Sequence, residues 1–264
     1  MTDSRYRWGG LAWVLTLQFF VVEAIAASQY GGYSYSADVI SDLGTAGSAA
    51  RVLMNASFIA QGVLIAAGAL LLAPGLAGAG AKLARVLLVV AGLGVLLVGL
   101  FPADGEATVH QIAAAAHFLG GGMGLIALAY AVRPRSEALG TALALLGLVG
   151  VIGTIFFAAA VFLGLGEGGM ERVAGYVIPI GLAVAGAALW RQKDDWLRLT
   201  NTDGTPSRRQ LRENARLERA QRAAERDRAL EAASGRSGRP AARTRPDDEP
   251  DDFDPEDPWA PRRG

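Results

Sequence analysis

The chain contains no cysteine and only two histidines among its 264 residues. Without cysteine no disulfide can hold the loops, so their order must come from helix packing. Charged side chains are also nearly absent from six long stretches of the first 190 residues. A soluble all-α protein would instead show helices with charged faces, so that class is excluded. The chain has neither a His-x-x-x-His pair nor a Gly-x-Ser-x-Gly turn, and therefore lacks two diagnostic signs of hydrolases.

The six apolar stretches predict an all-α, polytopic membrane protein. Each is close to the roughly 20 residues that cross a hydrocarbon core about 30 Å thick. Such spans must be helical, because a helix satisfies its own backbone hydrogen bonds where water is absent. The predicted transmembrane domain covers residues 1–190, and its spans lie near residues 10–27, 53–72, 86–101, 112–132, 139–163 and 173–190.

Basic residues predict the orientation. Nearly all of them precede the first span, follow the sixth or lie on alternate loops: Arg5, Arg7, Lys82, Arg85, Arg133, Arg135, Arg191, Lys193 and Arg198. The opposite loops hold only Arg51 and Arg172 as cations. By the positive-inside rule, we expect an integral cell-membrane protein with both termini in the cytoplasm. The first run also resembles a secretory signal ending at Ala24-Ile25-Ala26, although it is long for one.

The segment 191–264 differs sharply in composition and is predicted to be a cytoplasmic tail. Residues 208–245 contain twelve arginines and five acidic residues, and residues 247–257 contain eight acidic residues and no basic one. Strong helix formers predict a charged helix near residues 206–233, whereas residues 234–264 have the composition of disorder. The arginines could bind anionic lipids of the inner leaflet. Nucleic acid is not expected as a partner, because few aromatic residues are interleaved for base stacking.

Polar residues within the spans are predicted to gather in the outer half of the membrane. His110 and His117 are two helical turns apart and so project from one face. Ionisable groups at membrane depth normally face a bundle interior or a water-filled cavity. We therefore expect an outward-facing polar pocket, with these lining residues: Glu23, Asn55, Gln61, His117, Glu171 and Arg172.

Small residues are predicted to fill the inner half, where they would let helices approach closely. They include the Gly120-x-x-x-Gly124 pair, with Gly147, Gly150 and Gly153 on the next span. No span is visibly broken and no internal repeat is evident. These features do not favour a transporter, whose substrate site usually lies near the midplane at broken helices.

The outer loop between the first two spans contains Tyr33-Ser34-Tyr35-Ser36 and Ile40-Ser41-Asp42-Leu43-Gly44. Ser36 is predicted to cap a short helix, and Gly44 to end it in the left-handed conformation. Together with Asn55, Phe101-Pro102-Ala103-Asp104 and His110, this loop resembles the family catalogued as domain of unknown function 998. The resemblance covers about residues 8–190. It implies six spans without an assigned reaction, and marks as family positions Ser41, Asp42, Asn55, Asp104 and His110.

Three functional classes follow. The first is a binding protein, sensor or scaffold, in which the histidines bond neighbouring helices and Glu23 pairs with Arg51 or Arg172. The second is a membrane-embedded hydrolase or transferase, with these candidate catalytic residues: Ser41 or Ser36 as nucleophile, His110 as general base, and Asp42 or Asp104 to orient it. In a variant of this class, a divalent metal is held by Asp42, Asp104, His110 and His117. The third is a small-solute transporter.

Overall fold

The computed structural model describes residues 2–76, 78–191 and 208–237. It divides the chain into two compact units, Met1–Ser207 and Arg208–Gly264, which we describe separately. The predicted disorder beyond residue 237 and the acidic block 247–257 lie outside the described residues. All regular structure in the described part is helical, and six helices are long and apolar enough to cross a membrane. The predicted fold class, an all-α multi-pass membrane protein, is confirmed at that level.

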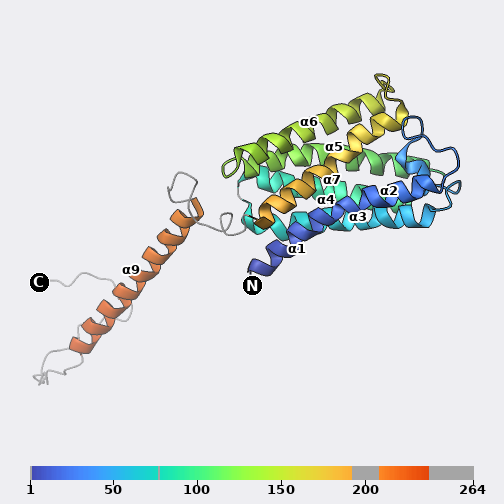
Figure 1. Cartoon of the computed structure of the whole chain (residues 1–264). Coiled ribbons are helices and arrows are strands. Elements are labelled where there is room, and N and C mark those ends of the chain that lie inside the picture. The colour runs from blue at the N-terminus through green and yellow to red at the C-terminus, as the bar shows by residue number, and fades with distance from the viewer. Residues whose placement is uncertain (1, 77, 192–207, 238–264) are drawn as a thin grey trace, which may run out of the picture. The chain divides into compact units, whose positions relative to one another are not determined.

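The first unit contains six helical spans, and the longest segment between them is 29–50 (Figure 1). The first span, Ser4–Ser28, comprises α1 (Thr2–Val14), the 3₁₀ turn η1 (Leu15–Leu17) and α2 (Gln18–Ser28). The other elements, in chain order, are η2 (Ile40–Gly44), α3 (Arg51–Leu72), η3 (Ala73–Gly75), α4 (Ala79–Leu100), α5 (Ala107–Val132), α6 (Glu137–Ala158) and α7 (Glu167–Arg191).

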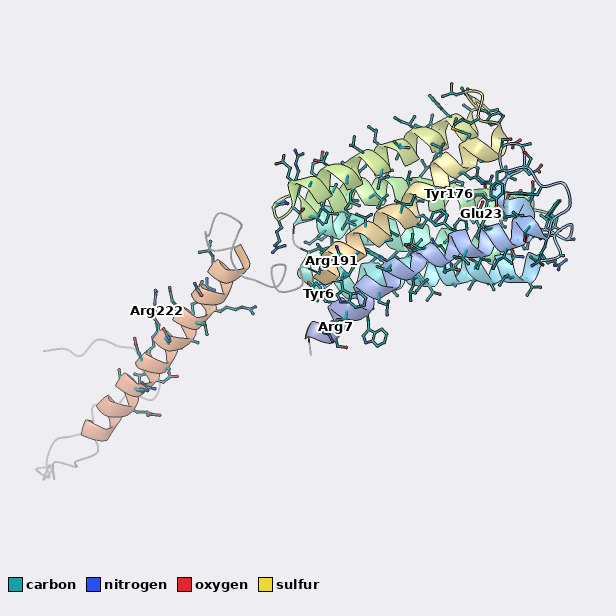
Figure 2. The ribbon with its side chains drawn as sticks, viewed as in Figure 1. Tyr6, Arg7, Glu23, Tyr176, Arg191 and Arg222 are labelled. Atoms are coloured by element: carbon teal, nitrogen blue, oxygen red, sulfur yellow. The ribbon has the colours of Figure 1, made fainter. Side chains whose placement is uncertain are left out.

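Successive spans pack side by side from α3 to α7, and α1 then packs against both α7 and α3, which closes a ring. Helices α5 and α7 also touch each other across the ring. They are the most buried spans: 61% of the most apolar stretch of each is buried inside the protein. The corresponding share for α6 is 28%, so α6 is peripheral. The segments 29–50, 101–106 and 159–166 lie at one end of the bundle, here called the loop end. Arg7 and Arg191 lie at the other end (Figure 2).

The first span contains a 3₁₀ turn, η1, within an otherwise continuous helix, so the expectation of unbroken spans holds. At η1 the buried Thr16 hydroxyl lies 2.5 Å from the carbonyl oxygen of Trp13 and 3.2 Å from that of Pro179. Pro179 lies inside α7 and cannot donate the usual backbone bond to the preceding turn. The 3₁₀ turn of the first span and the proline-containing turn of α7 therefore face each other inside the bundle. Hydropathy does not reveal this 3₁₀ turn, because its residues are about as apolar as their neighbours.

Small residues do lie at close helix contacts, but along the whole bundle rather than in one half. A side chain at Gly62 would collide with the Gly92 carbonyl oxygen, and one at Gly147 would come within 2.6 Å of that of Gly122. Near the loop end, a side chain at Gly99 would come within 2.6 Å of the Asn55 carbonyl oxygen. The prediction that small residues are gathered in the inner half of the membrane is therefore wrong. Close backbone approach holds helices together at every depth.

The fifth apolar run continues past the end of its helix. Helix α6 ends at Ala158, whereas the run extends to residue 163. Residues 159–166 form a turn in which Ala160 and Leu163 have positive φ, as do Gly164 and Gly166. Apolar composition marks residues that tolerate lipid, but it does not show where the backbone leaves the helix.

The second unit contains α9 (Arg208–Ser237). Its sequence has nine arginines and five acidic residues. Glu218 and Arg222, one helical turn apart, form the expected pair at 3.3 Å, with both side chains exposed. Leu211, Leu217 and Leu230 are exposed as well, so α9 has no core of its own. An exposed pair of this kind contributes little to stability, about 0.3–0.5 kcal/mol.

Candidate functional site

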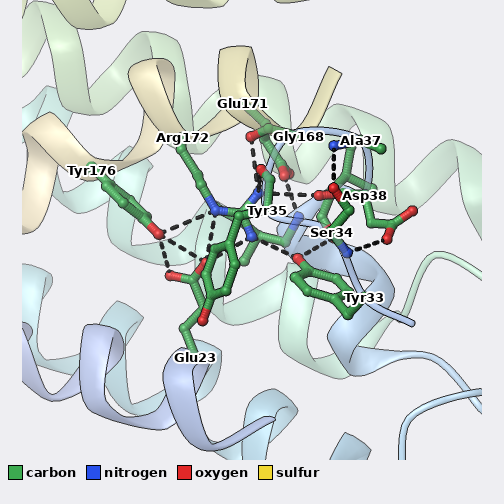
Figure 3. A network of polar contacts seen from close by, with 12 residues as sticks. Glu23, Tyr33, Ser34, Tyr35, Ala37, Asp38, Gly168, Glu171, Arg172 and Tyr176 are labelled. Carbon is green, nitrogen blue, oxygen red and sulfur yellow. Dashed lines mark hydrogen bonds and ion pairs between the residues drawn. The ribbon is translucent and has the colours of Figure 1, made fainter. Parts of the chain in front are cut away.

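Two groups of polar side chains lie close together at the loop end. The first, here called the Arg172 network, joins α2, α7 and the segment between α2 and α3 (Figure 3). The second lines a cavity among α2, η2, α3, α4, α5 and α7. We describe the network first because it positions one wall of the cavity.

Arg172 is 7% exposed, and every N–H of its guanidinium has an acceptor. Its Nε donates to Glu23 Oε1 at 3.0 Å, and its Nη2 lies 2.9 Å from the same oxygen. The Tyr176 hydroxyl lies 2.9 and 2.8 Å from the two Glu23 oxygens, to which it can donate. Glu23 is 1% exposed, so this ion pair is dry and fully bonded, as a buried pair requires. The predicted pairing of Glu23 with Arg172 is confirmed.

Arg172 also holds the segment after α2. Its Nη1 donates to the carbonyl oxygens of Tyr35 at 2.7 Å and Asp38 at 3.1 Å, and its Nη2 donates to the Tyr33 hydroxyl at 2.6 Å. The guanidinium lies 4.7 Å from the centre of the Tyr35 ring, within cation–π range. Burial raises the pKa of Tyr33, so its phenol keeps its proton and donates to the Val39 carbonyl oxygen at 3.0 Å.

Residues 33–46, here called the cap segment, are held from the other side too. Asn55 Nδ2 donates to the Gly44 carbonyl oxygen at 2.8 Å, and Asp104 Oδ2 accepts from the Ala46 N–H at 2.7 Å. The short helix in the segment, η2, begins at Ile40 and has no side-chain cap. The predicted Ser36 cap is therefore wrong. Gly44 has no positive φ either; a side chain there would collide with Asn55 Oδ1.

The cavity beneath the cap segment is lined by apolar and polar side chains together. The centres of water-sized molecules can occupy a volume of about 40 Å³ inside it. That is room for about three waters, since one needs about 10–15 Å³ on this scale. The lining residues are Phe19, Ile40, Ser41, Phe58, Gln61, Val95, Val98, His110, Ala114, His117, Phe118, Glu171, Gly175 and Pro179.

Both histidines have a fixed orientation. His110 Nδ1 lies 2.8 Å from the Phe101 carbonyl oxygen, and His117 Nδ1 lies 3.0 Å from that of Ala91 on α4. A carbonyl only accepts, so each Nδ1 must carry the proton, and each Nε2 of the neutral ring is an acceptor. Neither Nε2 has a partner among the described residues. The expectation that the histidines bond a neighbouring helix is confirmed for His117.

Gln61 and Glu171 complete the polar lining. Gln61 is 2% exposed, and its Oε1 lies 3.4 Å from Gln18 Nε2. Its own amide N–H groups have no partner in the described part of the chain. Glu171 is 6% exposed and accepts the Ile40 N–H through Oε2, and its Oε1 is unpaired within the same described ranges. The cavity thus combines an apolar wall with several polar atoms whose hydrogen-bonding capacity is unused.

The predicted pocket and catalytic residues thus divide into three sets. Gln61, His117 and Glu171 line the cavity, as do Ser41 and His110 from the predicted catalytic set. Glu23 and Arg172 belong to the Arg172 network. Asn55, Asp42 and Asp104 lie around the cap segment instead: Asn55 Oδ1 is buried without a partner among the described residues, Asp42 is half-buried and Asp104 is exposed. Burial raises the pKa of Asp42, and the charge of Asp38 raises it further.

The proposed metal ligands Asp42, Asp104, His110 and His117 do not form a cluster. Within the described ranges, no group of three or more His, Cys, Asp or Glu side chains is placed to hold a metal ion. Sequence reasoning also missed residues of both sites. Tyr176 is one helical turn from Arg172, a spacing that indicates a shared face. Phe19, Phe58 and Phe118 give no such signal, because apolar residues surround them in the sequence.

The comparison with known proteins identifies one family. A family model described as "Protein of unknown function (DUF998)" matches residues 14–189, which include all six spans in whole or in part. The chain belongs to this family. No curated protein and no solved structure matches this DUF998 protein. The matched region contains both the Arg172 network and the cavity, whereas α9 lies outside it.

Proposed function

We propose that this DUF998 protein is a membrane-embedded binding protein whose cavity takes up a small, largely apolar molecule with a polar head. The observation that carries this proposal is the unused hydrogen-bonding capacity of Gln61, His110, His117 and Glu171 around one cavity. Polar atoms in a mostly apolar site lose free energy if a ligand leaves them unpaired, so a ligand that pairs several of them is favoured. Pockets of mostly apolar wall with a few convergent polar groups are typical of small-molecule sites.

The test is a thermal-stability screen of small molecules on the full chain in lipid nanodiscs. A ligand at about one hundred times its Kd stabilises a protein by about 2.7 kcal/mol. Ala114→Leu places extra carbon atoms inside the cavity without removing a polar group. Ala115→Leu, on the exposed neighbouring position, is the matched control.

We expect hits that stabilise the unmodified protein and Ala115→Leu but not Ala114→Leu. The unliganded Ala114→Leu protein should still unfold cooperatively. A screen without hits, or hits that stabilise Ala114→Leu equally, would contradict the proposal, because the binding would then not involve this cavity.

Orientation forms part of the proposal. An even number of crossings puts the two ends of the membrane unit on one side, where Lys82, Arg85, Arg133 and Arg135 also lie. By the positive-inside rule that side is the cytoplasm, so the loop end and the cavity face outward.

Single cysteines test this orientation without background, because the chain has none of its own. Gly31 lies at the loop end and Glu137 at the opposite end, and both are exposed. Of Gly31→Cys and Glu137→Cys, only the former should react with an impermeant thiol reagent on intact cells. Reaction of Glu137→Cys alone would reverse the proposed orientation.

The tail is proposed to bind the anionic inner leaflet through its arginines, each contributing about 1 kcal/mol near the surface. The acidic block at residues 247–257 would compete for them. Deleting that block should strengthen sedimentation of the tail with anionic vesicles. Unchanged sedimentation would count against this role.

A hydrolase is the second candidate, because Ser41 and His110 line the same cavity. The Nδ1 bond to Phe101 leaves His110 Nε2 as the basic nitrogen that a general base needs. In this mechanism Ser41 would be the nucleophile. A fluorophosphonate probe should label the unmodified protein and lose that labelling in Ser41→Ala and His110→Gln. Equal labelling of Ser41→Ala would rule out Ser41 as nucleophile.

A further inference from the structure

Buried negative charge exceeds buried positive charge at the loop end. Among the described residues, the buried ionisable side chains with full charges are Glu23, Glu171 and Arg172. Arg172 bonds Glu23 and gives its other N–H groups to tyrosines and backbone carbonyls. Asp42 adds a half-buried acid, and Arg51 on this end is exposed. An ionised Glu171 therefore has no cation bonded to it in the described structure.

The unused polar atoms around the cavity are mostly acceptors. They comprise Glu171 Oε1 and the Nε2 atoms of His110 and His117, with the Ser41 hydroxyl able to accept as well. The Gln61 amide is the opposing donor. An ammonium group has three N–H donors and no acceptor, so it complements this set. A carboxylate or phosphate ligand would meet mainly lone pairs of like character.

Aromatic rings form part of the apolar wall. Phe19 and Phe58, with ring centres 6.0 Å apart, line the cavity together with Phe118. The face of an aromatic ring attracts a cation placed within about 6 Å of its centre. Such rings can also pack against a hydrocarbon chain. The wall therefore suits both parts of a short organic amine.

We propose that the cavity binds a small organic amine as its cation, with Glu171 as the counter-ion and His110 and His117 as acceptors. This inference rests on the proposed binding function and specifies its ligand class. Three waters occupy about 90 Å³ of liquid, so the cavity accommodates a ligand of about five non-hydrogen atoms. Larger amines require movement of the surrounding side chains.

Three probes with the same four-carbon chain separate charge from shape: n-butylamine, n-butanol and butyrate. Binding to the full chain in nanodiscs is measured by saturation-transfer NMR titration, with empty nanodiscs subtracted. We expect butylamine to bind about tenfold or more tightly than butanol, because an ion pair strengthens its hydrogen bond. Butyrate should bind least. This ranking needs no variant protein.

Glu171→Gln then tests the counter-ion. Glutamine keeps an oxygen for the Ile40 N–H but removes the charge, so the affinity for butylamine should fall to that for butanol. Glu167→Gln, at an acid in the first turn of the same helix, is the matched control and should keep the preference. An unchanged preference in Glu171→Gln would overturn the role of Glu171.

The outcomes separate the two proposals. If butanol binds as tightly as butylamine and Ala114→Leu abolishes both, the amine inference fails and the binding cavity stands. If no probe binds, or if butylamine binds Ala114→Leu as well as the unmodified protein, both the amine inference and the proposed use of the cavity are overturned.

Discussion

Glu171 and Arg172 are consecutive residues of α7, yet they belong to opposite kinds of polar site. Arg172 has an acceptor for every N–H, whereas Glu171 faces a cavity in which several polar atoms have no partner among the described residues. A network in which every group is paired makes the structure rigid. Removing one side chain from it leaves another polar group buried and unpaired. An unsaturated cavity contributes little to the empty protein and leaves capacity for a ligand. Within one helical turn, the chain thus combines a saturated polar network with a cavity whose polar atoms could pair with a ligand.

The largest expected effect comes from Arg172→Met, which leaves Glu23 buried without its cation. Breaking a buried pair costs about 3–5 kcal/mol. The measurement is thermal unfolding in one detergent. The control is Arg133→Met, which breaks the exposed pair with Glu137 at 3.3 Å and should cost less than about 1 kcal/mol. Equal losses in the two variants would show that the Arg172 network does not stabilise the fold.

Tyr33→Phe should have the next largest effect, because it removes the acceptor of Arg172 Nη2 and the donor to Val39. A hydrogen bond to a charged group contributes about 1.5–3 kcal/mol. Tyr35→Phe is the matched control: its ring still packs on Arg172, and its hydroxyl has no partner in the described part of the chain. Comparison of the two unfolding temperatures tests the prediction, which fails if Tyr35→Phe costs as much.

Gln61→Leu examines the cavity side of the comparison. The side chain is buried, and its hydrogen bond from Gln18 is long at 3.4 Å. A leucine of similar volume removes an amide with unused N–H groups, so the stability of the empty protein should change by less than about 1 kcal/mol in either direction. Thermal unfolding without ligand measures this. A loss as large as that of Arg172→Met would place Gln61 with the structural residues.

Asp42→Asn should have the smallest effect, and one that depends on pH. Burial raises the Asp42 pKa above its ordinary value of 3.8, so the folded protein holds this proton more tightly than the unfolded chain. Ionised Asp42 therefore lowers stability, and this loss develops as the pH rises from 3.8 through the folded pKa. Asp42→Asn should unfold at a slightly higher temperature than the unmodified protein at about pH 7 and at the same temperature at about pH 3. A higher unfolding temperature of Asp42→Asn at both pH values would show that the charge of Asp42 is not the cause.

Several features of the fold and site could be predicted because they depend on composition and spacing. Histidines two turns apart were expected on one face, and His110 and His117 both line the cavity. The hydrogen bond from Thr16 to the Pro179 carbonyl oxygen could not be predicted, because Pro179 lies in a helix that is distant in the sequence. Ser36 failed as a cap because η2 begins only at Ile40, in a segment that is also held by contacts with α7 and α3.

The sequence by itself determined that the chain forms six apolar helices, because a bilayer leaves the backbone no other way to bond itself. It also determined which ionisable groups lie near the loop end, since helical rise converts position into depth. Only the tertiary structure decided their partners. Neighbouring residues of a helix point about 100° apart. The same turn of α7 therefore directs Arg172 to Glu23 and Glu171 to the cavity, and the packing of the other helices determines what each one meets.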